Sequence, residues 1–320
     1  MMAHSPKGYE LLKQVHADYL RAGARVVTTN TYSVTPSTAE ATEIPLENLV
    51  GLAVTAAVEA RQVFLEEYKI ENVDAVEPEV LVCGSVPPLR SSFQPEALPD
   101  DETLKKEYSQ LCSLLVPKVD AIFIETLSCI REVLVCLDVC KNYQKPSQKL
   151  FLGVGVYENA TLPSGEGVGD MLDAIFKKYN SCLPFDVLNF NCSTMDNIEG
   201  ALEKVREWEG LNGKTITLGA YPNRMDHTVG SLKQKYARDN QNGDPEFWNR
   251  ITLWKGEERA FAQRLMSWHV HYNVQYLGGC CLFGPEYIQA LNVAKSCHVR
   301  HVNLQEVEIA ASGKQQHFCL

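Results

Sequence analysis

Short, continuously apolar runs alternate along the chain with longer segments of helical periodicity, and this alternation restricts the fold more than any other feature. Strands that are apolar on both faces are typical of parallel sheets, whose connections cross the sheet through helices. We predict strands at residues 25–29, 80–84, 121–124, 150–156, 186–190, 215–220 and 274–277. We predict helices at residues 9–22, 46–68, 104–116, 130–140, 167–179, 195–208, 257–271 and 285–294. The chain is therefore predicted to be an α/β protein.

The order of the predicted elements favours a barrel. A closed (β/α)8 barrel contains eight strands, each followed by a helix. This sequence begins with a helix, and only the seven strand-like runs listed above follow it. The predicted fold class is therefore a TIM-type (β/α)8 barrel that lacks its first strand. An open, doubly wound parallel sheet is the alternative.

The length of the chain suits a single domain. Barrels of this type are commonly about 250 residues long and grow further by insertions. We assign residues 1–320 to one domain with a polar insertion at about residues 223–248, a stretch rich in Asn, Asp and Gly.

Charge and composition exclude several classes of partner. The net charge is −10, and contacts with phosphates supply most non-specific affinity for nucleic acids, so we expect no nucleic-acid binding. No uncharged apolar run reaches the ~18 residues of a membrane span, and residues 1–14 lack the apolar core of a secretory signal. We expect a cytoplasmic protein that binds small molecules, with its eleven cysteines present as thiols.

The strongest local signal is Gly278-Gly279-Cys280-Cys281, directly after the last predicted strand. The glycines allow a tight turn or the close approach of another group. Adjacent cysteines form a disulfide only with strain, whereas two thiolates at the end of a strand can both reach one metal ion. The alternative is a pair of buried, inert thiols, because cysteine is among the most buried residue types.

A second cysteine follows another predicted strand, in Asn189-Phe190-Asn191-Cys192-Ser193. In a barrel, Cys192, Cys280 and Cys281 would emerge at the rim that carries the active site. Three thiolates with one open position are typical of a catalytic zinc site, whereas structural zinc sites are closed by four protein ligands. Such a soft site suits a sulfur substrate, whose thiol would be deprotonated there.

Glu125 ends the apolar strand Ile122-Phe123-Ile124 and points to the same rim. A carboxylate at this position can accept a substrate ammonium group. The alternatives are a solvated carboxylate or a neighbour of a helix N-terminus.

Other candidates give weaker signals. Thr29 and Asn30 follow a strand and place polar groups at the rim, where they contact substrate or cap the next helix. The eight histidines show no metal-binding spacing and are interpreted as structural. The remaining cysteines are interpreted as small apolar residues: Cys83, Cys112, Cys129, Cys136, Cys140, Cys182, Cys297 and Cys319.

Taken together, the motifs resemble the homocysteine S-methyltransferase family, which has an Asn-Cys after the sixth barrel strand and a Gly-Gly-Cys-Cys after the eighth. Asn191-Cys192 and Gly278 to Cys281 match in order and spacing. The resemblance covers nearly the whole chain. It continues through residues 15–24, Thr28 to Tyr32, Gly84 to Pro88, Glu125-Thr126, Ser164 to Glu166 and Ala220 to Asn223.

The resemblance implies an enzyme with one Zn²⁺, held by Cys192, Cys280 and Cys281, in EC class 2.1.1. It implies that homocysteine binds through its thiolate at the zinc and through its ammonium at Glu125. Asn191, Thr29 and Asn30 are expected to be further substrate contacts. The thiolate would attack the methyl group of a donor and give methionine, which places the protein in methionine biosynthesis.

Two features refine this expectation. Members of the family begin with a strand that carries Asp-Gly-Gly, and this chain starts at the equivalent of the following helix. The length leaves no room for cobalamin or folate modules, and the chain ends soon after the last helix, unlike the betaine branch. We therefore expect a sulfonium donor, S-methylmethionine or S-adenosylmethionine. The alternative is a catalytically weak or inactive relative that binds zinc and homocysteine.

Overall fold

In the computed structural model, seven parallel strands form one sheet. The structure describes residues 5–72, 75–90, 92–225 and 257–297. Every strand pairs with its neighbour in sequence, so the strand order is β1-β2-β3-β4-β5-β6-β7. The strands are β1 (Val26–Thr28), β2 (Leu81–Val86), β3 (Ala121–Leu127), β4 (Lys149–Val154), β5 (Val187–Asn191), β6 (Leu218–Tyr221) and β7 (Val274–Leu277).

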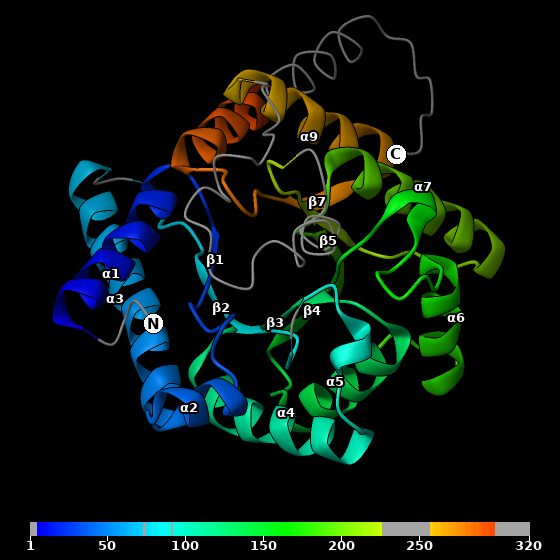
Figure 1. The fold of residues 1–320 in the computed structure, drawn as a ribbon. Coiled ribbons are helices and arrows are strands. Elements are labelled where there is room, and N and C mark those ends of the chain that lie inside the picture. The colour runs from blue at the N-terminus through cyan, green and yellow to red at the C-terminus, as the bar shows by residue number, and fades with distance from the viewer. Residues whose placement is uncertain (1–4, 73–74, 91, 226–256, 298–320) are drawn as a thin grey trace, which may run out of the picture.

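Helices connect these strands and lie outside the sheet (Figure 1). They are α1 (Pro6–Arg21), α2 (Pro36–Thr42), α3 (Leu46–Glu71), α4 (Asp101–Leu115), α5 (Ile130–Tyr143), α6 (Val168–Lys178), α7 (Met195–Asn212) and α9 (Glu258–Tyr272). A further helix occupies residues 285–297. The sequence predicted all of them except α2, which begins where Thr35 caps the helix through a hydrogen bond from the Thr38 N–H.

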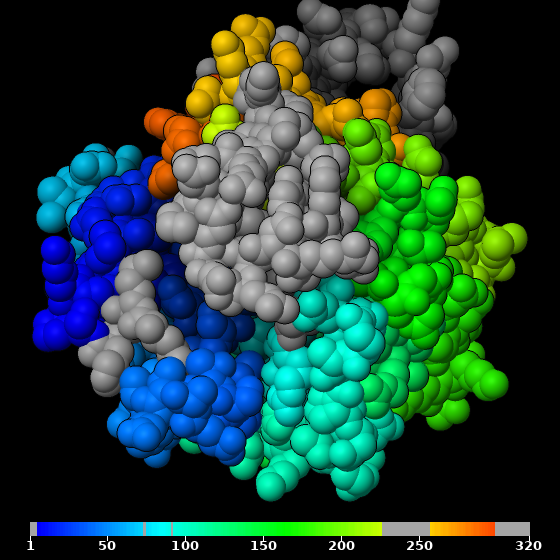
Figure 2. All heavy atoms as spheres, in the orientation of Figure 1, coloured from blue at the N-terminus to red at the C-terminus, as the bar shows by residue number. Residues whose placement is uncertain are grey.

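The sequential strand order distinguishes the two predicted architectures. A doubly wound sheet reverses its strand order at a switch point, whereas this order runs in one direction throughout. Figure 1 shows the strands curling around a common centre with the helices outside, and the helices form the outer surface in Figure 2. The prediction of a curled, parallel, barrel-like α/β fold is confirmed.

The two end strands of the sheet, β1 and β7, lie where the first strand of the barrel is predicted to be missing. Among the described strands, β1 pairs only with β2, and β7 pairs only with β6. That a first strand is missing between them remains a prediction. The predicted polar insertion lies outside the described residues, apart from residues 223–225.

Two apolar layers stabilise the sheet. The larger lies between the strands and the helices, and includes Leu152, Phe190 and Trp268, all with no exposed surface. The smaller lies on the inner face and consists of Cys83, Ala121, Phe123, Phe151 and Val187. Because side chains alternate between the faces of a strand, residues two positions beyond an inner-layer residue also face inward.

This alternation places polar side chains inside the carboxyl ends of four strands. Ser85 lies two residues after Cys83, and Glu125 lies two residues after Phe123. Asn191 continues the inner face of β5, and Tyr221 packs against the inner layer from β6. These four residues therefore line the rim that carries the active site in barrel enzymes.

Helix α3 belongs to the wall of the barrel. Among the described residues, it alone has the length and apolarity of a possible membrane span, and 44% of that stretch is buried. Its buried face includes Ala53, Ala57 and Ala60, and the helix packs against α1 and β2. This is the pattern of a core helix.

The buried histidine on α1 should make stability depend on pH. The Nε2 atom of His16 has no hydrogen-bond partner among the described residues, and burial lowers its pKa from 6.5 to about 4. The unfolded chain therefore binds a proton at a higher pH than the folded chain. Stability should be complete above about pH 6.5 and should fall by roughly 3 kcal/mol as the pH decreases towards 4.

Urea unfolding of the wild type and of His16→Leu at about pH 7.5 and about pH 5 tests this expectation. The wild type should lose more stability than the variant at the lower pH. Equal losses in the two proteins would show that His16 is not the group responsible.

Candidate active site

Three cysteine sulfurs meet at the carboxyl end of the sheet. The Sγ atom of Cys281 lies 3.9 Å from that of Cys192 and 3.9 Å from that of Cys280. All three sulfurs lie within 4.8 Å of one another. Cys192 directly follows β5, and the other two follow β7 after two glycines. The structure therefore brings together the three cysteines predicted to be metal ligands.

The loop after β6 holds both cysteine segments in place. The Asn223 side chain donates a hydrogen bond from Nδ2 to the carbonyl oxygen of Cys192, at 3.0 Å. The Cys280 N–H donates to the carbonyl oxygen of Pro222 at 2.7 Å, and the Arg224 N–H donates to that of Cys281 at 3.0 Å. Because these bonds use backbone groups, they fix the position of the cysteines without occupying the sulfurs.

One glycine of the Gly-Gly-Cys-Cys segment is required by packing. A Cβ atom on Gly279 would lie 2.6 Å from the Cβ of Phe283, closer than such atoms approach in proteins. Phe283 is buried and packs against Phe261 of α9. The glycine thus lets the cysteine loop pack closely on the helical layer, which agrees with the close approach expected from the sequence.

The structure corrects the prediction that all eleven cysteines are thiols. Cys192 and Cys280 are joined by a disulfide, with their Cα atoms 5.7 Å apart. The turn after β5 and the loop after β7 carry the two sulfurs to the same point, so the pair can oxidise. Metal binding requires the reduced form, because only a thiolate is a metal ligand.

The three sulfurs suit a zinc ion once the bond between Cys192 and Cys280 is reduced. Zinc–thiolate bonds of about 2.3 Å in a tetrahedron place the sulfurs roughly 3.8 Å apart, close to the two separations of 3.9 Å observed here. Cys192 is buried, Cys280 is half-buried and Cys281 is exposed, so the cluster opens to solvent on one side. Three sulfurs with one open side are typical of a catalytic rather than a structural zinc site.

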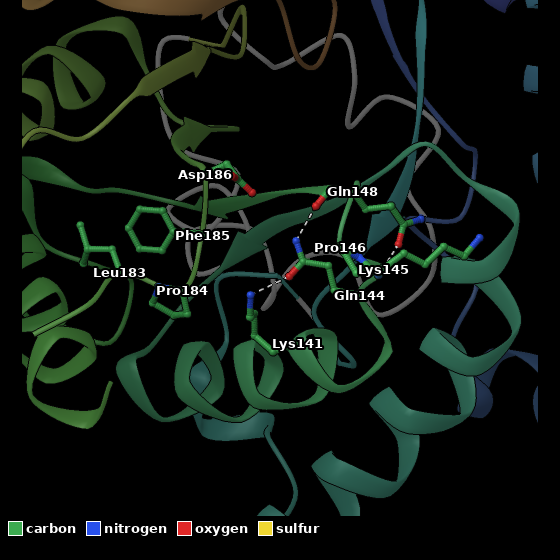
Figure 3. Close-up of a pocket in the computed structure, with 9 residues that line it drawn as sticks. All are labelled: Lys141, Gln144, Lys145, Pro146, Gln148, Leu183, Pro184, Phe185 and Asp186. Atoms are coloured by element: carbon green, nitrogen blue, oxygen red, sulfur yellow. Dashed lines mark hydrogen bonds between the residues drawn. The ribbon is translucent and has the colours of Figure 1, made fainter. Parts of the chain in front are cut away.

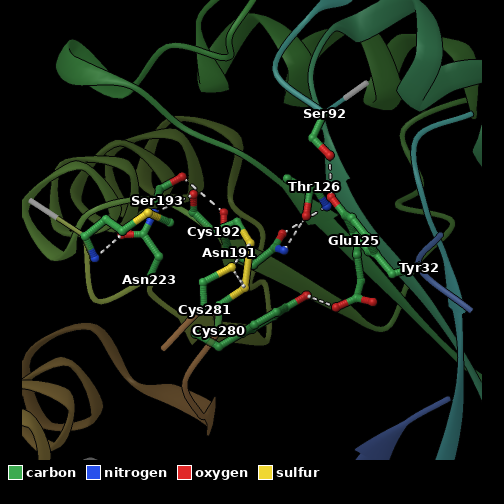
Figure 4. Close-up of a disulfide and its surroundings, with 12 residues drawn as sticks. Tyr32, Ser92, Glu125, Thr126, Asn191, Cys192, Ser193, Asn223, Cys280 and Cys281 are labelled. Atoms are coloured by element: carbon green, nitrogen blue, oxygen red, sulfur yellow. Dashed lines mark hydrogen bonds between the residues drawn. A yellow bond between two sulfur atoms is a disulfide. The ribbon is translucent and has the colours of Figure 1, made fainter. Parts of the chain in front are cut away.

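Glu125 lies on the same rim (Figure 4). Its carboxylate is buried and accepts hydrogen bonds from the Ser85 hydroxyl and, at 3.2 Å, from the Tyr221 hydroxyl. Burial raises the pKa of Glu125, and these two hydrogen bonds oppose the increase. No cationic side chain among the described residues forms an ion pair with Glu125, so its charge is available to a ligand.

Thr29 and Asn30, the two candidate substrate contacts in the loop after β1, differ in their burial. Thr29 is buried, and its Oγ1 accepts a hydrogen bond from the Ser85 N–H at 3.1 Å. Thr29 therefore supports the strand that carries a partner of Glu125. Asn30 is exposed on the same loop. Substrate contacts by Thr29 and Asn30 remain predictions.

Asn191 lies between the cysteines and the end of β3 in Figure 4. Its Oδ1 accepts a hydrogen bond from the Thr126 N–H at 3.0 Å, and its Nδ2 donates to the Thr126 hydroxyl at 2.6 Å. Both polar ends of the side chain are thus engaged within the protein. Direct contact of Asn191 with substrate remains a prediction.

The sequence places Tyr221 and Asn223 in a polar loop at the rim and Ser85 in a stretch that resembles the family, but it identifies none of them as a partner of Glu125 or Cys192. Ser85, Tyr221 and Asn223 all lie at or just beyond the carboxyl end of a strand. That position is a usable signal in a barrel protein, because the active-site rim is built from these ends.

A separate cavity lies at the opposite end of the strands (Figure 3). It has a volume of about 320 Å³ and is lined by Lys141 at the end of α5 and by residues of the segments that precede β4 and β5, including Gln144 and Asp186. The Gln144 side chain is engaged within the protein, because it accepts a hydrogen bond from Lys141 and donates one to the carbonyl oxygen of Gln148. The cavity is remote from the cysteines and Glu125.

The other described cysteines agree with their interpretation as apolar residues in most cases. Cys83, Cys112, Cys129, Cys136 and Cys140 are buried, whereas Cys182 and Cys297 are exposed. Cys319 lies outside the described residues.

Similarity to known proteins extends over most of the chain. The sequence model of a family described as homocysteine S-methyltransferase matches residues 2–294. Homocysteine S-methyltransferase 1 of Brassica oleracea var. italica is 27% identical over 303 residues, which cover 89% of this chain and 83% of the relative. Homocysteine S-methyltransferase of Escherichia coli (strain K12) is 27% identical over 301 residues, covering 88% and 83% of the two chains.

Solved structures show the same fold. The crystal structure of the homocysteine methyltransferase MmuM from Escherichia coli in its metallated form has a TM-score of 0.67 and 23% identity. The match covers 89% of this chain and 84% of that chain. The oxidized form of the same protein also has a TM-score of 0.67, with 24% identity.

Proposed function

Because this chain belongs to the homocysteine S-methyltransferase family, we propose that it transfers a methyl group to the thiol of L-homocysteine in a zinc-dependent reaction that gives methionine. The observation that carries the proposal is the convergence of three cysteine sulfurs at an exposed rim, beside a buried carboxylate that no basic side chain among the described residues neutralises. The first feature suits a thiol and the second suits an ammonium group, and homocysteine contains both.

Cys192, Cys280 and Cys281 would hold the zinc ion. When bound, zinc supplies Lewis acidity, which keeps the substrate sulfur deprotonated and nucleophilic near neutral pH. The exposed side of the cluster at Cys281 leaves room for a ligand from solution. The hydrogen bonds from the β6 loop keep the cysteine backbone fixed while substrate enters and leaves.

Glu125 would bind the homocysteine ammonium group. Ser85 and Tyr221 orient its carboxylate, and a charge-assisted hydrogen bond in a buried site is stronger than one in water. With the amino end held at Glu125 and the sulfur at the cysteine cluster, the substrate is fixed at two points. Methyl transfer depends mainly on such positioning, because the protein itself forms no covalent bond.

The proposed donor is a sulfonium compound, S-methylmethionine or S-adenosylmethionine. The homocysteine sulfur attacks the methyl carbon, a new carbon–sulfur bond forms, and the bond from the methyl to the donor sulfur breaks. The electron pair of the broken bond returns to the donor sulfur, which becomes a neutral thioether. The charge on the donor makes this sulfur a good leaving group.

We further propose that the reaction belongs to methionine biosynthesis in the cytoplasm, where reduced thiols persist. No feature of the described residues favours the alternative of a weak or inactive zinc-binding relative.

Mass spectrometry of methionine formed from deuterated homocysteine tests the proposed reaction. The reduced, zinc-loaded protein is incubated with this acceptor and with S-methylmethionine, S-adenosylmethionine or betaine. The deuterium label distinguishes methionine made from the acceptor from methionine released by S-methylmethionine. We expect deuterated methionine with at least one sulfonium donor. Absence of deuterated methionine with all three donors, in protein that contains one zinc per chain, would contradict the proposal.

A further inference from the structure

Strand β3 contains a β-bulge at the active-site rim. Its register with β4 runs from Ile124 opposite Leu152 to Leu127 opposite Val154. Glu125 and Thr126 therefore lie opposite a single residue, Gly153. A bulge of this kind adds one residue to a strand and redirects the neighbouring side chains, and bulges often occur next to active sites. Glu125 keeps the inward direction that regular alternation from Phe123 gives it, and the extra residue after it turns Leu127 to the outer core.

The extra residue has an unfavourable backbone conformation. Thr126 has φ of +58°, in the left-handed region that glycine adopts readily and that β-branched residues rarely adopt. A residue held in such a conformation persists only when its surroundings impose it. Thr126 is fully buried, so the constraint comes from within the protein.

Asn191 provides that constraint. Its amide binds both the N–H and the hydroxyl of Thr126, at 3.0 Å and 2.6 Å, and Asn191 is itself buried. Asn191 is on β5, so its side chain reaches β3 across the intervening strand β4. Gly153 leaves this path open, because a Cβ there would lie 2.5 Å from the Ile124 carbonyl oxygen and 3.1 Å from Asn191 Oδ1.

The pair connects the two halves of the site. Asn191 immediately precedes Cys192, and Thr126 immediately follows Glu125. We propose that Asn191 is a positioning residue that holds Thr126 in its left-handed conformation and so fixes the Glu125 carboxylate relative to the cysteine cluster. Its role in substrate binding rests on the proposed function, whereas its effect on the bulge does not.

A double-mutant cycle tests this inference with Asn191→Ala, Thr126→Gly and the variant that carries both changes. Asn191→Ala leaves the buried N–H of Thr126 unpaired, removes one partner of its hydroxyl and releases the bulge. It should lower the midpoint of thermal unfolding by several degrees and raise the KM for homocysteine about tenfold, with one zinc still bound. Glycine adopts a positive φ without strain, so adding Thr126→Gly should restore much of both losses.

The cycle separates positioning from direct contact. If Asn191 binds homocysteine itself, the raised KM will persist in the double variant, and the proposal is overturned. If neither stability nor KM recovers, Asn191 does not act through Thr126. Should Asn191→Ala fail to fold, Asn191→Asp keeps an acceptor for the Thr126 N–H and is used in the same cycle. If the wild-type protein transfers no methyl group, the proposed function is contradicted. The thermal unfolding measurements would still decide whether Asn191 holds the bulge.

Discussion

Replacement of Cys281 by serine is expected to remove the bound zinc and to reduce kcat/KM for methyl transfer by roughly a thousandfold or more. A serine hydroxyl is not ionised at neutral pH and is a poor ligand for zinc compared with a thiolate. Because Cys281 is exposed, the exchange of sulfur for oxygen leaves the core packing unchanged. Metal analysis and initial rates, measured on the same preparation, check this result.

Cys182→Ser is the matched control for this experiment. Cys182 is also exposed, but it lies in the turn after α6, where its N–H donates to the carbonyl oxygen of Tyr179. This variant should retain both zinc and activity. A Cys281→Ser protein that has lost its zinc and still forms methionine would contradict the assignment of the metal centre.

Glu125→Gln should raise the KM for homocysteine about 100-fold, because a buried ammonium group loses its charged partner. The amide has nearly the shape of the carboxylate, so the site should remain packed. Zinc content should not change, since Glu125 does not belong to the cysteine cluster. Steady-state kinetics with varied homocysteine, together with metal analysis, measure both quantities.

The pH dependence of homocysteine binding provides a second test of whether the Glu125 carboxylate binds the ammonium group. Its pKa is raised by burial, and the carboxylate must be ionised to bind an ammonium group. The KM of the wild type should therefore rise as the pH falls, starting at a higher pH than for an exposed glutamate. This rise should disappear in Glu125→Gln. An unchanged KM in the variant at neutral pH would exclude Glu125 as the ammonium site.

The barrel-like fold was predictable because each strand carries its own local signal. Strands such as Ile122-Phe123-Ile124 are apolar on both faces and are separated by long periodic helices. The short helix α2 was missed, although Thr35-Pro36 is a capping residue followed by proline at the first helical position. Seven residues are too few for a convincing periodic pattern.

The convergence of the cysteines was predictable for a topological reason. Cys192 and the Cys280-Cys281 pair each follow a strand, and the carboxyl ends of parallel strands meet at one rim. The disulfide between Cys192 and Cys280 was not predictable, because it depends on the distance between two loops. The sequence shows Cys280 and Cys281 as an adjacent pair and contains no signal that links Cys280 to Cys192.

The bulge at Thr126 had no sequence signal. A residue with positive φ is usually a glycine or an asparagine, whereas a threonine in a strand predicts regular β structure. Its conformation is imposed by Asn191, which is distant in the sequence and belongs to another strand. A tertiary contact of this kind fixes the backbone directly after Glu125.

X-ray absorption at the zinc edge, with and without homocysteine, tests the central claim most directly. We expect about three sulfur ligands at about 2.3 Å in the reduced, zinc-loaded protein, supplied by Cys192, Cys280 and Cys281. We expect a fourth sulfur at a similar distance when homocysteine is added. A zinc ion with fewer than three sulfur ligands, or a sulfur count that homocysteine does not change, would contradict the account.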